Sequence, residues 1–162
     1  MSKKQEKPGV KVVATNRKAR HDYSIEDTIE AGIVLAGSEI KSIRDGRVNL
    51  RDSFAAIEGG EVWMHNVHIA PYNPASHYGH EPRRRRKLLL HRRQIARLES
   101  RVQEKGYTLI PLRIYLSHNR AKVELALARG KRQYDKRAAI AAREDQRRTE
   151  RALRERERER YD

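Results

Sequence analysis

The chain changes character around residues 130–137, where a patterned body gives way to a tail that cannot build a core of its own. From Arg129 to Asp162 the sequence holds 13 Lys/Arg and 8 Asp/Glu, and its only large aliphatic residues are Ile140 and Leu153. So little apolar surface cannot offset the conformational entropy that a chain loses when it orders. The folded core must therefore be built before residue 130.

The tail nevertheless favours helix once something orders it. The alanines within residues 138–142 and the Glu/Arg alternation of residues 154–160 have high helix propensity. Because isolated helices of this length are marginal in water, we expect a tail that is disordered when free and helical when bound. The predicted organisation is a flexible N-terminal arm (residues 1–10), a folded domain (residues 11–130) and a basic C-terminal tail (residues 131–162).

The net charge indicates a polyanionic partner. The chain carries +15 with a pI of about 10.5, and the tail from Arg129 accounts for +5, which leaves +10 on the body. Such a body attracts nucleic acid or an acidic membrane surface. The sequence has no apolar run near the ~18 residues of a spanning helix, no secretory leader and no lipidation motif, so nucleic acid is favoured. Cysteine is absent, which excludes disulfides and fits the cytoplasm.

Patterning in the body predicts mostly antiparallel strands. Along residues 122–127 the odd positions are Val or Leu and the even positions are Lys, Glu and Ala, which predicts one core face and one exposed face. The expected elements are a strand over 23–35, a helix over 39–44 capped by Ser38 and ended by Gly46, a hairpin of 53–58 and 61–69 turning at Gly59-Gly60, a mobile loop between Pro71 and Pro82, a helix over 92–105 ended by Gly106, and a hairpin of 108–116 and 121–128 turning at 117–120.

Several antiparallel strands with two or three short helices predict a mainly β fold. Periodicity alone leaves a small barrel and a sandwich both open. Among small barrels, the oligonucleotide-binding type combines a β surface with a charged groove. A small antiparallel barrel of this type is the fold class that we predict.

Two basic clusters in the body are candidate nucleic-acid contacts. The run Arg83–Lys87 places five like charges in a row, which repel one another unless a polyanion neutralises them. In a loop all five can reach phosphates; the alternative is a solvated charge run. Residues 16–21 combine arginine forks that suit phosphates with Asn16, whose amide can read a base edge. For this second cluster the alternative is a flexible basic arm.

Few aromatic side chains are available for stacking on bases. Trp63 lies within a strand pattern, and we expect it in the core rather than on a stacking surface. Tyr134 lies among basic residues in a segment with little core to join. Stacking on a base is therefore the favoured interpretation for Tyr134.

Seven histidines raise the question of catalysis or metal binding. His65 and His68 would fall on opposite faces of a strand, and His77 and His80 have no cysteine or ordered carboxylate to complete a site. The sequence contains no glycine-rich phosphate loop, no His-Glu-x-x-His and no Gly-x-Ser-x-Gly. We expect no enzyme activity, no metal and no cofactor.

Five motifs stand in order across nearly the whole chain. They are Asn16-Arg17-Lys18-Ala19-Arg20-His21, Glu30-Ala31-Gly32, Gly37-Ser38-Glu39-Ile40-Lys41-Ser42-Ile43-Arg44, Arg86-Lys87-Leu88-Leu89-Leu90 and Gly130-Lys131-x-x-x-Asp135-Lys136-Arg137. No single motif is decisive, but five in register argue against a chance match. With them the sequence resembles the SsrA-binding protein (small protein B, SmpB) family of bacterial ribosome rescue.

The resemblance implies an oligonucleotide-binding barrel that holds the tRNA-like domain of transfer-messenger RNA (tmRNA). It also implies a tail that enters the decoding centre and empty messenger channel of a stalled ribosome. The chain would then be a non-enzymatic adaptor of trans-translation in the cytoplasm. Its partners would be tmRNA, small-subunit rRNA and, indirectly through the charged RNA, elongation factor Tu. The family's RNA-contacting positions correspond to Glu30, Leu89 and His91 here.

At three places this chain departs from the commoner family residues. His91 stands where many relatives carry Asn, and its imidazole can stack or donate. Tyr134 stands where His is common before Asp-Lys-Arg, so the π face is kept and the protonatable cation is lost. Toward the end of the tail, where relatives often carry an apolar pair, this chain has Ala152-Leu153.

The clusters and the resemblance together give the expected contact residues. On tmRNA they are Asn16, Arg17, Arg20, His21, Glu30, Gly37, Glu39, Lys41, Arg44, Arg83, Arg84, Arg85, Arg86, Lys87, Leu89, His91 and Lys131. At the decoding centre they are Tyr134, Asp135, Lys136 and Arg137, with Asp135 expected to cap the tail helix. In the messenger channel they are Arg143, Arg147, Arg148, Arg151, Leu153 and Arg154.

Two other functions stay open on the sequence. A general ribosome-associated RNA-binding protein or RNA chaperone would carry the same charge without specificity for one RNA. A basic hydrolase that uses the histidines is the third hypothesis. Competition by bulk tRNA separates the first two, and a nuclease assay with and without chelator tests the third.

Overall fold

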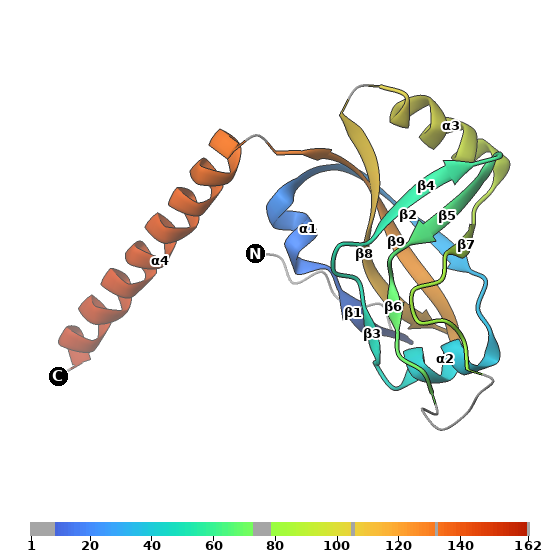
Figure 1. Cartoon of the computed structure of the whole chain (residues 1–162). Helices are drawn as coiled ribbons and strands as arrows, with labels where there is room; N and C mark the ends of the chain where they lie inside the picture. The colour runs from blue at the N-terminus through green and yellow to red at the C-terminus, as the bar shows by residue number, and fades with distance from the viewer. Residues whose placement is uncertain (1–8, 73–78, 105, 132, 162) are drawn as a thin grey trace. The chain divides into compact units, whose positions relative to one another are not determined.

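The computed structural model describes residues 9–72, 79–104, 106–131 and 133–161 (Figure 1). Most of the expected N-terminal arm and the centre of the expected mobile loop, residues 73–78, lie outside the described residues. The chain divides into two compact units, one up to Gly130 and one from Lys131. The first unit is built on strands and the second on a helix.

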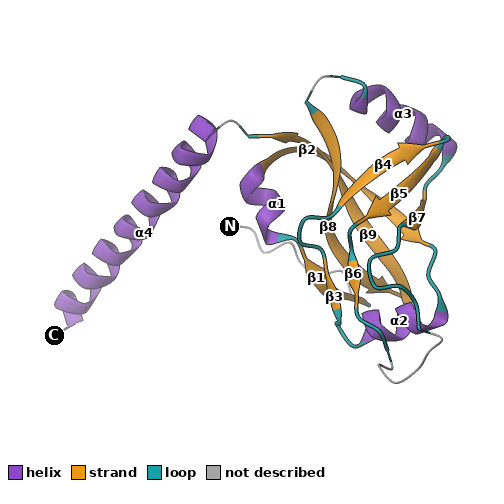
Figure 2. Cartoon of the chain, viewed as in Figure 1, coloured by secondary structure: helices purple, strands orange, loops and turns teal. Residues whose placement is uncertain are grey.

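Antiparallel strands of the first unit close into a barrel (Figure 2). Within the described residues they form a seven-stranded sheet in the order β1-β8-β4-β5-β7-β2-β9, and β8 also pairs with β9, which closes the ring. The prediction of a mainly β antiparallel barrel is confirmed. The strands are β1 (Val10–Thr15), β2 (Tyr23–Ile33), β4 (Phe54–Glu58), β5 (Glu61–His65), β7 (Arg86–Leu89), β8 (Tyr107–Ser117) and β9 (Arg120–Gly130), with β3 (Val48–Asn49) and β6 (His68–Ile69) forming a separate pair.

Three helices of the described body pack on this barrel: α1 (Arg17–Asp22), α2 (Gly37–Arg44) and α3 (Arg92–Val102). In Figure 1, α3 covers the upper end of the barrel and α2 the lower end. Ile43 of α2 and Leu98 of α3 are buried in the same core as Val62, Leu88 and Leu125 of the strands. Full burial of one such side chain contributes about 1.5–3 kcal/mol, so the helices seal the ends of the core.

Strand β9 is buried on both faces, which corrects the expectation of one exposed face. Ala126 and Ala128 pack with Ala19 of α1 and with Ile110 and Leu112 of β8 in a second, smaller cluster. Because α1 covers this part of the outer surface, small residues there are interior residues. Period-two alternation reports which residues share a face and does not report what covers that face.

Both predicted hairpins form. Gly59 and Gly60 take φ of +59° and +77° between β4 and β5, and His118 and Asn119 take φ of +50° and +62° between β8 and β9. Two successive positive φ values are typical of the tight turns that match strand twist. The predicted strand over 61–69 is interrupted, because Asn66 also takes a positive φ of 60° and separates β5 from β6.

Helix boundaries differ from the expectations in detail. Gly46 follows the C-cap of α2 at φ +73°, as expected, but the N-cap is Ala36 and Ser38 lies inside the first turn. Helix α3 ends at Val102, before the expected end at residue 105, and Gly106 at φ +90° belongs to the connection into β8. Four elements were not expected at all: β1, which includes Val10 of the expected arm, α1, β3 and β7.

The second unit is the helix α4 (Gln133–Tyr161). Its two large aliphatic residues, Ile140 and Leu153, are exposed, so within this unit they join no core. The favoured helical conformation is therefore observed, while disorder in the free protein stays a prediction. No helix in the described parts of the chain has the length and apolarity needed to cross a membrane.

Candidate nucleic-acid interface

Glu30 and Leu89, two of the residues that the family resemblance singles out, lie on the outer surface of neighbouring strands. Gly32 of β2 pairs with Leu89 of β7, and Glu30, two residues before Gly32 on the same strand, faces the same way. His91 follows β7 as the N-cap of α3. All three are exposed, Leu89 by 52%. Together with Lys122 they are called the β2–β7 patch below.

Lys122 enters the patch through β9. It pairs with Gly32 on one side and with Tyr115 of β8 on the other. Lys122 is not among the contact residues expected from the sequence, because its place near Leu89 depends on the pairing of three strands. The alternation of β9 signals an outward side chain and gives no information on its neighbours.

Gly32 lets Leu89 lie close to β2. A Cβ at position 32 would come within 3.3 Å of the Leu89 Cβ, tighter than most such contacts. Because Gly32 has no side chain, the exposed Leu89 side chain can pack directly against the β2 backbone. An exposed large apolar side chain of this kind is suited to contact a sugar or a base face.

Glu30 is held by a buried tyrosine. The Tyr115 hydroxyl donates to the Glu30 carboxylate. Burial, and then the hydrogen bond to Glu30, raise the pKa of Tyr115 far above its usual value, so the phenol stays a donor. Next to Glu30 across the sheet, Glu124 pairs with Arg113. One Glu30 oxygen is thus oriented by the protein, and the residue can accept a further hydrogen bond from a partner.

The basic run Arg83–Lys87 does not present five free charges. Three carboxylates form ion pairs with four of its members. Glu39 pairs with Arg84 and Arg86, Glu58 with Arg85 at 2.8 Å, and Glu61 with Lys87 at 2.7 Å. Arg83 donates to the Asn66 amide oxygen at 2.7 Å. The picture of a loop whose five charges all reach phosphates is therefore wrong, because long-range carboxylates already neutralise most of them.

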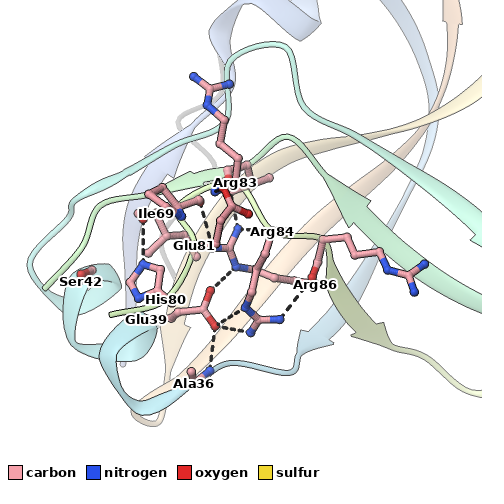
Figure 3. Close-up of polar contacts among 12 residues, drawn as sticks. Ala36, Glu39, Ser42, Ile69, His80, Glu81, Arg83, Arg84 and Arg86 are labelled. Atoms are coloured by element: carbon pink, nitrogen blue, oxygen red, sulfur yellow. Dashed lines mark hydrogen bonds and ion pairs between the residues drawn. The ribbon is translucent and has the colours of Figure 1, made fainter. Parts of the chain in front are cut away.

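Glu39 and Arg86 form the buried centre of this network (Figure 3). Both side chains have no exposed surface, and Arg86 also donates to the carbonyl oxygens of Val67, Arg84 and Pro82. A side chain with no exposed surface cannot contact RNA, so the expected RNA contacts by Glu39 and Arg86 are corrected to a supporting role. The ion pair joins α2 to the first residue of β7.

The ionisation of this pair follows from its contacts. Burial alone would raise the pKa of Glu39, but hydrogen bonds from Arg84, from the Ala36 N–H and from Arg86 outweigh it, and the pKa of this carboxyl is lowered. Burial lowers the pKa of Arg86, and the bonds to Glu39 offset part of that effect. Both groups stay charged at neutral pH.

Asn16 is also a structural residue. It is 6% exposed, its amide donates to the carbonyl oxygens of Leu50 and Pro111, and its Oδ1 accepts from the Ala19 N–H as the N-cap of α1. The expected base contact by Asn16 is corrected for this reason. The flexible-arm alternative for residues 16–21 is wrong as well, because Asn16 anchors a helix there.

The arginines of α1 lie on the surface. Arg17 and Arg20 are exposed, and His21 contacts Asp22 at 3.0 Å. A hollow of about 300 Å³ lies beside α1 and is lined in part by Lys18, Tyr23 and Phe54. On α2, the expected contacts Gly37, Lys41 and Arg44 are exposed too.

Trp63 was expected in the core, and that prediction is wrong. The β5 strand alternates buried and half-buried positions, and Trp63 is half-buried on the outer face with the Arg85 guanidinium 4.2 Å from its ring centroid. The core positions of this strand are its neighbours Val62 and Met64.

The expected ribosome contacts lie on α4. Tyr134, Asp135 and Lys136 fall in its first turns, so Asp135 is inside the helix rather than at the expected N-cap. Arg137 is exposed. So are the expected channel residues Arg143, Arg147, Arg148, Arg151, Leu153 and Arg154, whereas Lys131 is half-buried before the helix.

Histidines build no metal site in the described parts of the chain, where no cluster of three ligating side chains occurs. His65 on β5 bonds Glu58 at 3.0 Å, and His68 lies on a different strand. His80 bridges the Ser38 hydroxyl and the Ile69 carbonyl oxygen, at 2.9 Å each. His77 lies outside the described residues.

Comparisons with known proteins give one answer. The family model described as SmpB protein matches residues 13–155. SsrA-binding protein of Roseiflexus castenholzii is 62% identical over 149 residues, with 91% of this chain and 94% of the relative covered. SsrA-binding protein of Thermobifida fusca is 60% identical over 155 residues, covering 95% and 97%.

A solved structure is also similar. It is described as "tmRNA-SmpB: a journey to the center of the bacterial ribosome" and shares 50% sequence identity with this chain at a TM-score of 0.64. The match covers 78% of this chain and 93% of the other. With the family model spanning most of the sequence and relatives near 60% identity over nine-tenths of it, the chain belongs to the SmpB, or SsrA-binding protein, family.

Proposed function

We propose that this protein binds the tRNA-like domain of tmRNA and delivers the RNA to stalled ribosomes for trans-translation. The relatives are SsrA-binding proteins, and the similar solved structure concerns tmRNA and SmpB on the bacterial ribosome. The observation that carries the proposal in this chain is the β2–β7 patch. It combines exposed Glu30 of β2 with exposed Leu89 of the neighbouring strand β7, and exposed His91 follows that strand.

The composition of the patch suits a structured RNA. Leu89 offers apolar contact, His91 a ring that can stack, Lys122 a cation for a phosphate and Glu30 an acceptor for a 2′-hydroxyl or a base amine. A surface that only collected polyanions would have no use for Glu30, since its charge repels phosphate. The acidic residue therefore favours recognition of a particular RNA over general RNA binding.

The helix α4 supplies the second activity. Its arginines are exposed along residues 137–160, and it follows the last barrel strand after a short connection. We infer that Tyr134–Arg137 contact the rRNA of the decoding centre and that the later arginines follow the messenger channel. Exposed arginines on one helix can neutralise rRNA phosphates without a core of their own.

This role is that of an adaptor and requires no chemistry by the chain. It implies action in the cytoplasm, where ribosomes translate. The alternative of a general RNA chaperone is not favoured, because the curated relatives are SsrA-binding proteins and the patch carries a selective element.

A competition experiment tests the function. Full-length protein is mixed with labelled tRNA-like domain at about 0.2 M salt, an ionic strength that weakens non-specific complexes strongly. A large excess of bulk tRNA is then added. We expect the specific complex to survive, with unlabelled tRNA-like domain as the competitor that removes it. If both competitors displaced the labelled RNA equally well, the protein would be a general RNA-binding protein without specificity for tmRNA.

A further inference from the structure

An aromatic surface lies on the outer face of β4 and β5. Phe54 pairs with His65 across these strands, and their rings stack with centroids 5.1 Å apart and an interplanar angle of 14°. The next outward position of β5 is Trp63, over which Arg85 lies with 4.2 Å between the guanidinium carbon and the ring centroid. Phe54 is 43% exposed and the Arg85 side chain 55%. Phe54, Trp63, His65 and Arg85 are called the aromatic strip.

One carboxylate fixes the geometry of this strip. Glu58 accepts from the Arg85 guanidinium at 2.8 Å through one oxygen and contacts the His65 ring at 3.0 Å through the other. The guanidinium is thereby held over the indole before any ligand arrives. A planar cation that already lies on one aromatic ring, with much of its surface exposed, is a prepared surface for another flat π system.

The strip is continuous with the β2–β7 patch. Trp63 pairs directly with Lys87 of β7, and Leu89 lies two residues further along the same face. A hollow of about 570 Å³, lined by Lys87, Leu89 and Arg92 among others, follows this side of the barrel. An RNA that contacts Leu89 therefore has the Arg85–Trp63 pair within the same outer surface.

We propose that the Arg85–Trp63 pair is a stacking site for an unpaired base of the tRNA-like domain of tmRNA, an extension of the interface that rests on the function proposed above. Splayed bases stack on arginine planes and aromatic rings. Stacking tolerates any base, because every base has a π face. The commitment to tmRNA rests on the continuity with Leu89; ribosomal RNA is the competing source of the same chemistry.

The chain offers a direct probe of this site, because Trp63 is its only tryptophan. Full-length protein is titrated with the tRNA-like domain, and quenching of Trp63 emission by acrylamide is measured with and without RNA. Binding itself is followed separately by gel shift. We expect the bound RNA to shield Trp63 from acrylamide, and the shielding to saturate together with the gel shift.

Variants separate stacking from charge. Arg85→Lys keeps the positive charge but loses the planar guanidinium group, so it should weaken RNA binding by about fivefold or more. Arg97→Lys is the matched control, since exposed Arg97 bonds Asp27 rather than lying over an aromatic ring, and it should change binding less than twofold. Trp63→Leu, which keeps an apolar side chain on the strand, should lose affinity like Arg85→Lys, with its fold checked by circular dichroism.

The outcomes are distinguishable. Tight binding with unshielded Trp63, or equal effects of the two arginine variants, overturns the stacking site and leaves the adaptor function intact. Shielding by ribosomes but not by the tRNA-like domain overturns the assignment to tmRNA. Absence of specific binding by the wild-type protein contradicts the proposed function itself.

Discussion

The run Arg83–Lys87 and the tail helix α4 look alike in the sequence, but they have opposite surroundings in the structure. In the run, carboxylates from α2, β4 and β5 partner four of the five cations, and Arg86 is completely buried. In α4 the described arginine side chains are exposed. Arginine density alone therefore does not identify an RNA-binding surface; the positions of distant carboxylates decide how much charge is left for a polyanion.

The largest effect is expected where charge is buried. Glu39→Ala leaves Arg86 in the interior without its carboxylate, and removing one partner of a buried pair costs about 3–5 kcal/mol. Urea denaturation followed by circular dichroism measures the free energy of unfolding. Glu58→Ala removes a carboxylate from an exposed pair and should cost about 1 kcal/mol or less. Similar losses in the two variants would contradict the contrast.

The same pair predicts a pH dependence. Because the pKa of Glu39 is lowered in the folded protein, its contribution to stability is present above the ordinary pKa of a glutamate and is lost as pH falls through the folded value. The difference in unfolding free energy between wild type and Glu39→Gln should therefore shrink on acidification from pH 7. A difference that is the same at neutral and acid pH would show that Glu39 is not charged in the fold.

In the tail, replacing Asp135, Lys136 and Arg137 together by alanine should separate two activities. Binding of the tRNA-like domain should stay within about twofold, since the β2–β7 patch is untouched. Peptide tagging on ribosomes stalled without a codon should be lost, because the first turns of α4 can no longer contact rRNA phosphates. A reconstituted tagging assay at saturating tmRNA measures this. Normal tagging would limit the tail's action to Arg143 onward.

At the patch, Glu30→Ala should weaken tmRNA binding by about tenfold, the size of one lost hydrogen bond to a charged group. Generic electrostatics predicts the opposite sign, since the variant is more basic. Glu99→Ala, which removes an exposed carboxylate from α3, is the matched control and should bind as wild type or tighter. Unchanged binding by a folded Glu30→Ala protein would remove Glu30 from the interface.

The smallest effect is expected at Tyr115. Tyr115→Phe removes only the hydroxyl that orients Glu30, so binding should weaken by about threefold. In the double variant with Glu30→Ala the two losses should not add, because both act through one carboxylate. Additive losses would show that Tyr115 acts on binding by another route.

The sequence predicted those parts of the fold that depend on local signals. Gly59-Gly60 and residues 117–120 mark both hairpins through their turn conformations, and the strand pattern indicates an antiparallel barrel. The helix α1 was missed, because its six residues carry little apolar pattern and its anchor is the set of long-range bonds that Asn16 makes to Leu50 and Pro111.

The candidate site was predictable only in part, for the same reason. Family motifs point to Glu30, Leu89 and His91, and the strand register puts Glu30 and Leu89 on one outer surface. Burial of Glu39 and Arg86, and the outward position of Trp63, depend on which segments meet in space. Local patterning carries no information on contacts between distant segments. Glu39 and Arg86 were therefore predicted on the surface, and Trp63 in the core.

The polar network around α2 has a consequence for engineering. The Ile69 N–H donates to the Pro82 carbonyl oxygen at 3.0 Å, His80 donates to the Ile69 carbonyl oxygen, and Ser42 donates to that of Ala70 at 2.6 Å. The chain is thus fastened on both sides of residues 73–78, and loop closure becomes only slightly more costly as a loop lengthens. A reporter peptide inserted there would be flanked on both sides by residues that these hydrogen bonds hold in place. The insertion point is therefore suitable for labelling the functional protein.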